Sequence, residues 1–220
     1  MKALLKVMLT LALVFASTFI ILNATGIMTV EKIQLFLELA KSANPNFVAI
    51  IICSLLFADL FIAVPTLTVM ILGGYFLGAF YGAVAAITGL FFAGTCGYGL
   101  SAKYGDKLVN ALIKDQDKRD DAVRTFQNHG AIVILLSRAV PILPEVSACM
   151  AGMTRMPFAK FIMLWLISTI PYAIIASYAG AISTLENPKP AIITAIFLTA
   201  FFWSGWFVFR KFNRISKNKH

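Results

Sequence analysis

Long apolar stretches separated by short polar ones fill most of this 220-residue chain. A helix needs roughly 20 apolar residues to cross the hydrocarbon core of a bilayer. Three stretches approach or exceed that length: Leu4–Leu22, Phe76–Ala102 and Ala191–Phe209. A fourth runs over Phe158–Ala179, with Pro171 marking an expected kink. We therefore predict four spanning helices, the first of them a retained helix rather than a cleaved signal sequence.

Two further apolar stretches are broken by proline and carry charged residues. Phe47–Gly74 contains Asp59 and has Pro65 near its middle. Ala131–Gly152 is interrupted in the same way, by Arg138, Pro141, Pro144 and Glu145. Proline removes a backbone donor and clashes with the preceding turn, and broken backbone at membrane depth persists only where it is buried in protein or lines a cavity. Each stretch therefore predicts a re-entrant helical hairpin rather than a crossing.

The two broken stretches are also alike in sequence. The tripeptides Ala63-Val64-Pro65 and Ala139-Val140-Pro141 are identical, and Gly74 and Gly152 follow them at a similar distance. Paired, similarly placed segments of this kind point to the site of an inverted-repeat transporter. We therefore predict an all-α polytopic membrane protein, with about four spanning helices and two oppositely oriented re-entrant hairpins that form an inverted repeat.

Glycines in the second span and in the hairpins predict close helix packing. Gly78 and Gly82 form a small-xxx-small face, which lets two helices approach closely. The same packing role is expected for a further set of five: Gly73, Gly74, Gly89, Gly94 and Gly152.

Two polar segments separate the apolar ones. Glu31–Lys41 has apolar residues at helical spacing and predicts an interfacial amphipathic helix. Lys103–Asn128 predicts one or two short amphipathic helices at the surface. We accordingly divide the chain into an N-terminal part at 1–46, a core at 47–180 with hairpins at 47–74 and 131–152, and a C-terminal part at 181–220 with a basic tail.

The cations border the predicted spans unevenly. They gather at Lys2 and Lys6, between Lys103 and Arg124, at Arg155 and Lys160, and from Arg210 onward. Cytoplasmic loops carry the excess of Lys and Arg. Both termini are therefore expected in the cytoplasm, with the protein in a bacterial plasma (inner) membrane. The first hairpin then enters from outside and the second from inside.

The composition changes this picture little. The chain is 60% hydrophobic and 13% charged, against about 25% charged in soluble domains. The net charge is +9, but the cations border hydrophobic runs instead of forming a basic groove with exposed aromatics. No nucleic acid is therefore expected as a partner. Cys53, Cys96 and Cys149 lie singly in apolar segments and suggest packing residues. We expect no metal and no cofactor.

Three embedded charges mark the candidate site. Asp59, Arg138 and Glu145 lie in apolar stretches, where an unpaired charge costs a few kcal/mol or more. Pro65 and Pro144 are expected at the first positions of the returning half-helices, whose free N–H groups favour anions. With Arg138 they predict a pocket for a phosphate or carboxylate, which Glu145 neutralises when it is empty.

Two alternatives for these charges remain open. Asp59 is expected to approach Arg138 near the membrane midplane, and this pair is either part of the transport site or a salt bridge that only locks the hairpins together. A carboxylate in apolar surroundings also holds a proton more tightly, which makes Asp59 or Glu145 a candidate proton carrier.

Roughly residues 45 to 180 resemble the DedA-like, VTT-domain superfamily, also called SNARE-associated Golgi proteins. The resemblance is carried by the stretch Asp59–Gly105 with Pro65, Gly73-Gly74-Tyr75, Gly89, Gly94 and Tyr98, and by Arg138-Ala-Val-Pro141-Ile-Leu-Pro144, Ala151-Gly152-Met-Thr-Arg155, Phe158 and Phe161. It implies two opposed re-entrant hairpins and the movement of lipids across bilayers, including undecaprenyl phosphate. It also implies a dependence on an embedded acid and arginine, here Asp59 and Arg138.

This chain departs from the DedA pattern at two positions. DedA members usually carry Glu where this chain has Asp59, and a second Arg where it has Pro144. The chain is therefore expected to lie closer to the other VTT branch.

The hypothesis from sequence is a flippase or scramblase for an anionic, phosphate-bearing lipid, with proton linkage left open. Its expected partners are membrane lipids, with protons and a second copy of the chain as further candidates. A membrane scaffold that docks through the Lys103–Arg124 loop is the alternative. A lipid-phosphate enzyme is less favoured, since no histidine or Ser/His/Asp arrangement lies near the embedded charges.

Overall fold

The computed structural model describes residues 2–24, 33, 35, 44–62, 64–112, 116–140, 142–183 and 189–217. These residues form seven α-helices and one 3-10 turn, which confirms the all-α class. The elements are α1 (Lys2–Ala24), α3 (Pro45–Ala58), α4 (Thr66–Leu112), α5 (Gln116–Leu136), η1 (Ser137–Ala139), α6 (Leu143–Met153), α7 (Phe158–Ala181) and α8 (Lys189–Lys217).

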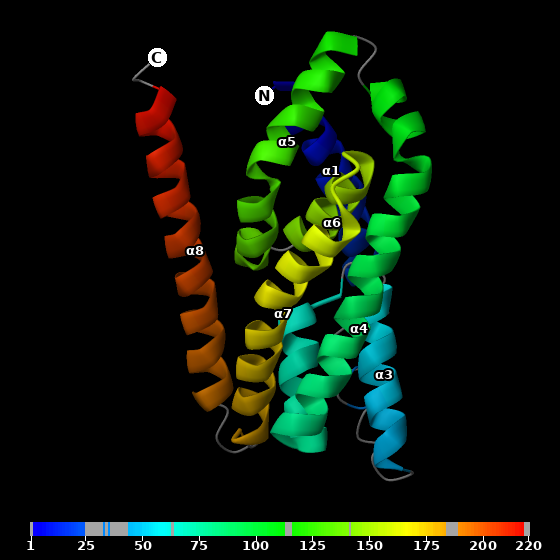
Figure 1. Ribbon diagram of the computed structural model, residues 1–220. Helices are drawn as coiled ribbons and strands as arrows, with labels where there is room; N and C mark the ends of the chain where they lie inside the picture. The colour runs from blue at the N-terminus through cyan, green and yellow to red at the C-terminus, as the bar shows by residue number, and fades with distance from the viewer. Residues whose placement is uncertain are drawn as a thin grey trace.

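The first broken stretch folds as α3 followed by the first part of α4. The Asn44 side chain caps α3 by accepting a hydrogen bond from the Asn46 N–H at 2.9 Å, and Pro45 occupies the first turn. The chain runs inward along α3, breaks after Ala58 and returns along α4 (Figure 1). At Gly78, with φ 80° and ψ 169°, α4 reverses and then runs the length of the molecule.

The second broken stretch is built from α5, η1 and α6. It enters from the opposite end of the molecule: α5 runs inward to Leu136, and α6 returns toward that end (Figure 1). The inner ends of the two broken stretches therefore meet near the middle of the molecule. α7 and α8 follow as long helices, and Pro171 lies inside the continuous α7.

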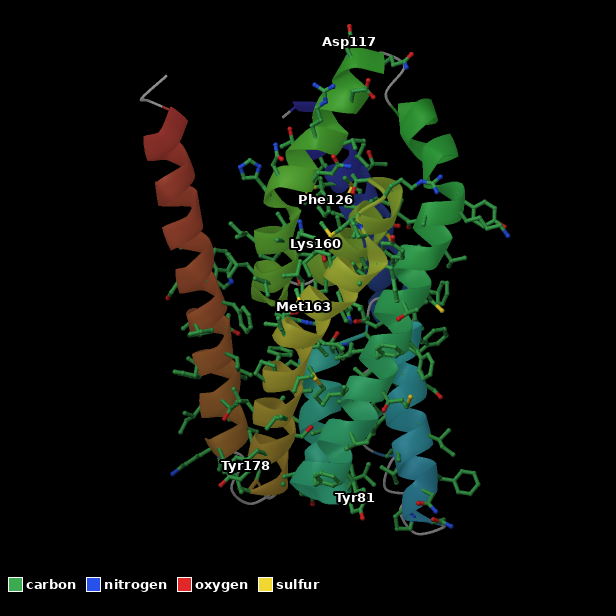
Figure 2. All side chains as sticks on the ribbon, in the orientation of Figure 1. Tyr81, Asp117, Phe126, Lys160, Met163 and Tyr178 are labelled. Carbon is green, nitrogen blue, oxygen red and sulfur yellow. The ribbon has the colours of Figure 1, made fainter. Side chains whose placement is uncertain are left out.

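Several helices begin or end at the same end of the molecule. α1 begins and α8 ends at the end where α4 ends and α5 begins (Figure 1). Figure 2 places Asp117 at that end, and Tyr81 and Tyr178 at the other. The cation-rich parts at the start of α1, at the end of α4 and start of α5, and at the end of α8 thus lie at one end of the molecule, whereas Lys160 lies further toward its middle (Figure 2).

Each broken stretch has its own apolar core, and α4 lies between the two. α4 packs against α3, α6 and α7. One core joins α3 and α4 to α7, with Ile52, Leu56, Met70, Ala86 and Ala173 among its buried residues. The other joins α5 and α6 to α1 and α7, with Val7, Phe126, Ile134, Met150 and Phe161.

The outer surface is apolar over the long helices. Among the described residues, two helical segments are long and apolar enough to cross a membrane: Thr66–Gly105, within which α4 reverses at Gly78, and Phe158–Ala181. Pro45–Ala58 and Lys189–Gly205 are shorter apolar helices. Large apolar side chains are exposed along them, for example Phe80, Phe92, Ile167, Ile193 and Phe201. An apolar surface of this extent is typical of a protein that contacts lipid.

Two expectations about local structure were wrong, and one lies outside the described residues. Lys103–Asn128 does not form separate short helices: it completes α4 and begins α5, because apolar residues such as the buried Phe126 continue the helical spacing. Gly78 is the reversal point of α4 and not a packing residue. Of the helix expected over Glu31–Lys41, only two residues are described, Ile33 and Leu35, both helical.

Candidate functional site

Asp59 closes the first break within its own hairpin. It follows the last residue of α3 and is only 4% exposed. One carboxylate oxygen, Oδ1, accepts a hydrogen bond from the Val64 N–H at 2.8 Å, and Oδ2 accepts one from the Thr66 hydroxyl at 2.7 Å. A buried carboxylate is tolerated when such donors satisfy it. The carboxylate of Asp59 therefore already occupies the beginning of α4, where an external anion was expected.

Pro65 lies directly before α4, one position earlier than expected. Its carbonyl accepts a hydrogen bond from the Val69 N–H at 3.0 Å, so it contributes an acceptor to the first turn of the returning helix. Pro65 thus helps to start α4. No hydrogen bond among the described residues joins it to Asp59, Arg138 or Glu145.

The second break places Arg138 and Glu145 on either side of a strained backbone. Arg138 lies in η1, and α6 begins at Leu143. Pro144 is the second residue of α6, one position later than expected, and Glu145 follows it in the first turn. Ile142 precedes α6 in a left-handed conformation, with φ 73° and ψ −21°. A β-branched residue with positive φ is unfavourable, so the surrounding packing holds this turn in place. Pro141 lies outside the described residues.

One face of α7 holds the Arg138 side chain. The guanidinium Nη2 donates a hydrogen bond to the Thr169 hydroxyl at 2.9 Å. Its Cζ lies 4.9 Å from the centroid of the Trp165 ring and 5.8 Å from that of Tyr172, both within cation–π range. The Nε of Arg138 is buried and has no hydrogen-bond partner.

Glu145 connects the two hairpins. Its carboxyl group is close enough to that of Asp59 for a hydrogen bond, and it interacts electrostatically with Arg138. Asp59 and Arg138 also interact electrostatically, but the direct hydrogen bonds of these two residues go to Val64, Thr66 and Thr169. The three embedded charges therefore form one cluster, in which Glu145 and not Arg138 is the direct neighbour of Asp59.

The charge balance of this cluster differs from the cationic pocket expected. Two carboxyl groups face one guanidinium, so the cluster is formally negative when all three groups are ionised. An incoming anion gains from Arg138 only when Glu145 moves away or takes up a proton, since like charges repel strongly at low dielectric.

The five glycines expected to pack closely all lie at tight contacts. A Cβ on Gly74 would overlap the Ser177 backbone of α7, and one on Gly152 would overlap the Tyr98 backbone of α4. On the other three, a Cβ would lie 3.2 Å from Ile52 (Gly73), 2.6 Å from the Cys53 carbonyl oxygen (Gly89) and 2.5 Å from the Trp165 ring (Gly94). Gly74, Gly89 and Gly152 thus bring the broken stretches against long helices, Gly73 lets the two arms of the first broken stretch approach each other, and Gly94 lets α4 approach α7.

Four functional candidates were missed from the sequence: Thr66, Trp165, Thr169 and Tyr172. Thr66 could have been found as the hydroxyl that follows Pro65 at the start of the returning helix. The other three are spaced i, i+4 and i+7 within an apolar span, which puts them on one helix face. Nothing in that spacing indicates that the face meets Arg138.

Comparisons with known proteins converge on one family. A family model of the VTT domain matches residues 64–182. An uncharacterised membrane protein of Synechocystis sp. is 30% identical over 142 residues, which cover 57% of this chain and 64% of that protein. Undecaprenyl phosphate transporter A of Bacillus subtilis is 30% identical over 127 residues, which cover 53% and 64%. The chain thus spans less than two thirds of the length of either relative. No solved structure matches.

Proposed function

Because this chain belongs to the VTT-domain (DedA) family of membrane proteins, we propose that it moves a phosphate-bearing lipid across the bilayer as a flippase or scramblase. The B. subtilis relative is named as a transporter of such a lipid, which favours transport over catalysis. The observation that carries the proposal is the Arg138 guanidinium, embedded where the two broken stretches meet, with a buried Nε that lacks a partner. This chain has Asp59 and Pro144 where DedA members usually have Glu and Arg, and these two differences affect which lipid we expect it to move. That the chain lies closer to the other VTT branch stays a prediction.

We further propose that the two broken stretches are re-entrant hairpins of an inverted repeat. Support comes from reciprocal glycine contacts. Gly74 of the first hairpin meets α7, the long helix that follows the second hairpin, whereas Gly152 of the second meets α4, the long helix that follows the first. The partner residues Ser177 and Tyr98 follow Gly152 and Gly74 at nearly the same sequence distance. Such repeats place substrate sites near the midplane.

The orientation we propose puts the end that bears Asp117 in the cytoplasm of a bacterial cell. The cations in the last part of α4, the first part of α5 and the C-terminal part of α8 support it by the positive-inside rule. Both termini are then cytoplasmic, and the two hairpins enter from opposite sides of the membrane.

The proposed mechanism exchanges Glu145 for the lipid phosphate at Arg138. The phosphate accepts hydrogen bonds from the guanidinium, which is planar, permanently charged and suited to two-oxygen recognition. Glu145 leaves or takes up a proton as the phosphate arrives, and this exchange would link transport to protons. Asp59 stays bonded to Val64 and Thr66 and keeps the first hairpin closed around the site.

Replacing Arg138 by lysine tests this proposal. In vesicles reconstituted with purified protein, Arg138→Lys is expected to lower the rate of movement of a labelled lipid phosphate about 10- to 100-fold, because lysine lacks the planar pair of donors worth about 1.5–3 kcal/mol. The thermal unfolding midpoint should change little.

The matched control is Arg124→Lys on the exposed surface of α5, which should transport at the wild-type rate. Full lipid movement by Arg138→Lys at equal protein density would contradict a phosphate site and leave a structural role for Arg138.

A further inference from the structure

The α7 residues that contact Arg138 are buried and are themselves held in place by neighbouring helices. Thr169 is fully buried, and Trp165 and Tyr172 are 2% and 9% exposed. The Trp165 indole N–H donates to the Leu90 carbonyl of α4 at 3.0 Å, and Gly94 leaves the room in which the ring lies. Tyr172 packs against Phe202 of α8, with ring centroids 5.8 Å apart. We call Trp165, Thr169 and Tyr172 the α7 cradle.

From this arrangement we infer that the α7 cradle positions the Arg138 guanidinium for the phosphate of the transported lipid, with Thr169 and Trp165 as positioning residues. The inference rests on the proposed function and deepens it. In this inference α7, which lies outside both hairpins, orients the guanidinium of Arg138, which belongs to the second hairpin.

The geometry of the guanidinium supports this assignment. A guanidinium is a rigid plane with five N–H donors around its edge. Rings at 4.9 and 5.8 Å from Cζ restrict where that plane lies, and the 2.9 Å bond from Nη2 to Thr169 restricts its rotation within the plane. The α7 cradle therefore fixes the direction of the remaining donors.

One of the remaining donors, the buried Nε of Arg138, has no hydrogen-bond partner among the described residues. Leaving a buried donor unsatisfied costs about 1–3 kcal/mol, and this cost disappears when an acceptor arrives. A phosphate oxygen is a strong acceptor for a guanidinium donor. The unpaired Nε is thus the donor that the α7 cradle leaves for such an acceptor.

Thr169→Val removes the acceptor while conserving shape, and Thr169→Ser keeps the hydroxyl. In reconstituted vesicles Thr169→Val is expected to lower the rate of lipid phosphate movement about 5- to 10-fold, whereas Thr169→Ser stays within about twofold of wild type, as the loss of one hydrogen bond to a charged group implies. Equal rates for Thr169→Val and wild type would overturn the inference while leaving the proposed function intact.

A double-mutant cycle separates positioning from packing. In an Arg138→Lys background the further change Thr169→Val should have little additional effect, because residues that act through one another are not additive. A full additional 5- to 10-fold loss would show that Thr169 acts independently of Arg138 and would overturn the inference. If Thr169→Val fails to fold, Trp165→Phe takes its place in the same cycle with the same criteria.

Indole fluorescence reports on the cradle directly. In a Trp203→Phe, Trp206→Phe protein, Trp165 is the remaining tryptophan. Its emission should change on addition of short-chain phosphatidic acid, at a midpoint that Thr169→Val raises and Thr169→Ser leaves in place. An unshifted midpoint in Thr169→Val would count against positioning. If neither phosphatidic acid nor inorganic phosphate changes the emission and the wild type moves no lipid, the proposed function itself fails.

Discussion

At the residue scale, the embedded charges differ in how their polar atoms are satisfied. Both oxygens of Asp59 accept hydrogen bonds from its own hairpin, so its carboxylate is a local closing element. Arg138 reaches across to Thr169 and leaves Nε unpaired, so its guanidinium has spare binding capacity. These two residues of opposite charge therefore have different roles, because the hydrogen bonds that each one already makes determine which of its polar atoms can still bind a ligand.

A prediction at the same scale concerns Ile142, whose positive φ is unfavourable for any residue with a Cβ. Ile142→Gly should be more stable than Ile142→Ala by about 1 kcal/mol, since both lose the side chain and only glycine relieves the backbone. Denaturant unfolding in detergent micelles measures the difference. At the exposed helical residue Ile132 the order should reverse. The same order at both sites would contradict a left-handed backbone at Ile142.

At the element scale, α4 consists of two helices that meet at a reversal. The backbone of Gly78 adopts φ 80° and ψ 169°, a region open almost only to glycine. The part before it belongs to the first hairpin and the part after it is a long helix that contacts α6 and α7. The glycine therefore determines where a returning half-helix ends and a spanning helix begins.

Gly78→Ala is expected to lower the free energy of unfolding by about 1–3 kcal/mol, entirely through backbone strain, since a Cβ there would have no atom within 4 Å. Gly99→Ala is the matched comparison: its Cβ would be equally free, but Gly99 lies in a regular helix. That substitution should be neutral or stabilising by up to about 1 kcal/mol. Chemical unfolding of both variants in one detergent tests the pair, and equal stabilities would argue against the reversal.

At the scale of the whole molecule, the two broken stretches enter from opposite ends and share long helices between them. Each packs through a glycine against the long helix that follows the other, so neither half buries its returning helix alone. The embedded charges meet where the inner ends of the hairpins come together, which requires both halves.

The orientation of the whole molecule is tested by labelling single cysteines in a variant that lacks the native ones. Cysteines at Asn128 and Ser216 should resist a membrane-impermeant thiol reagent added to intact cells and react after permeabilisation, because the cation-rich end is expected inside. A cysteine at Tyr81, at the opposite end in Figure 2, should react in intact cells. Labelling of position 128 or 216 from outside would invert the proposed topology.

Several features could be predicted from residue types alone. The breaks followed from Pro65 and Pro144, the packing glycines from their size, and the three embedded charges from the cost of burying them. Each of these rests on a property that a residue carries wherever it is placed. Lys103–Asn128 differs from the short helices predicted, because its apolar residues continue the helical spacing of α4 and α5, and helix length depends on the elements that follow and precede it.

The sequence by itself therefore determined the two breaks at the prolines, which residues are embedded and how closely its helices approach, because backbone donors, side-chain volume and charge are local properties. The reversal at Gly78 came only from the structure. Only the tertiary structure decided that Asp59 bonds to its own hairpin, that Glu145 joins the two hairpins and that Arg138 rests on α7. The contacts of Glu145 and Arg138 depend on how helices far apart in the sequence cross. The spacing of residues along one helix shows which residues share a face, but not which other helix that face contacts.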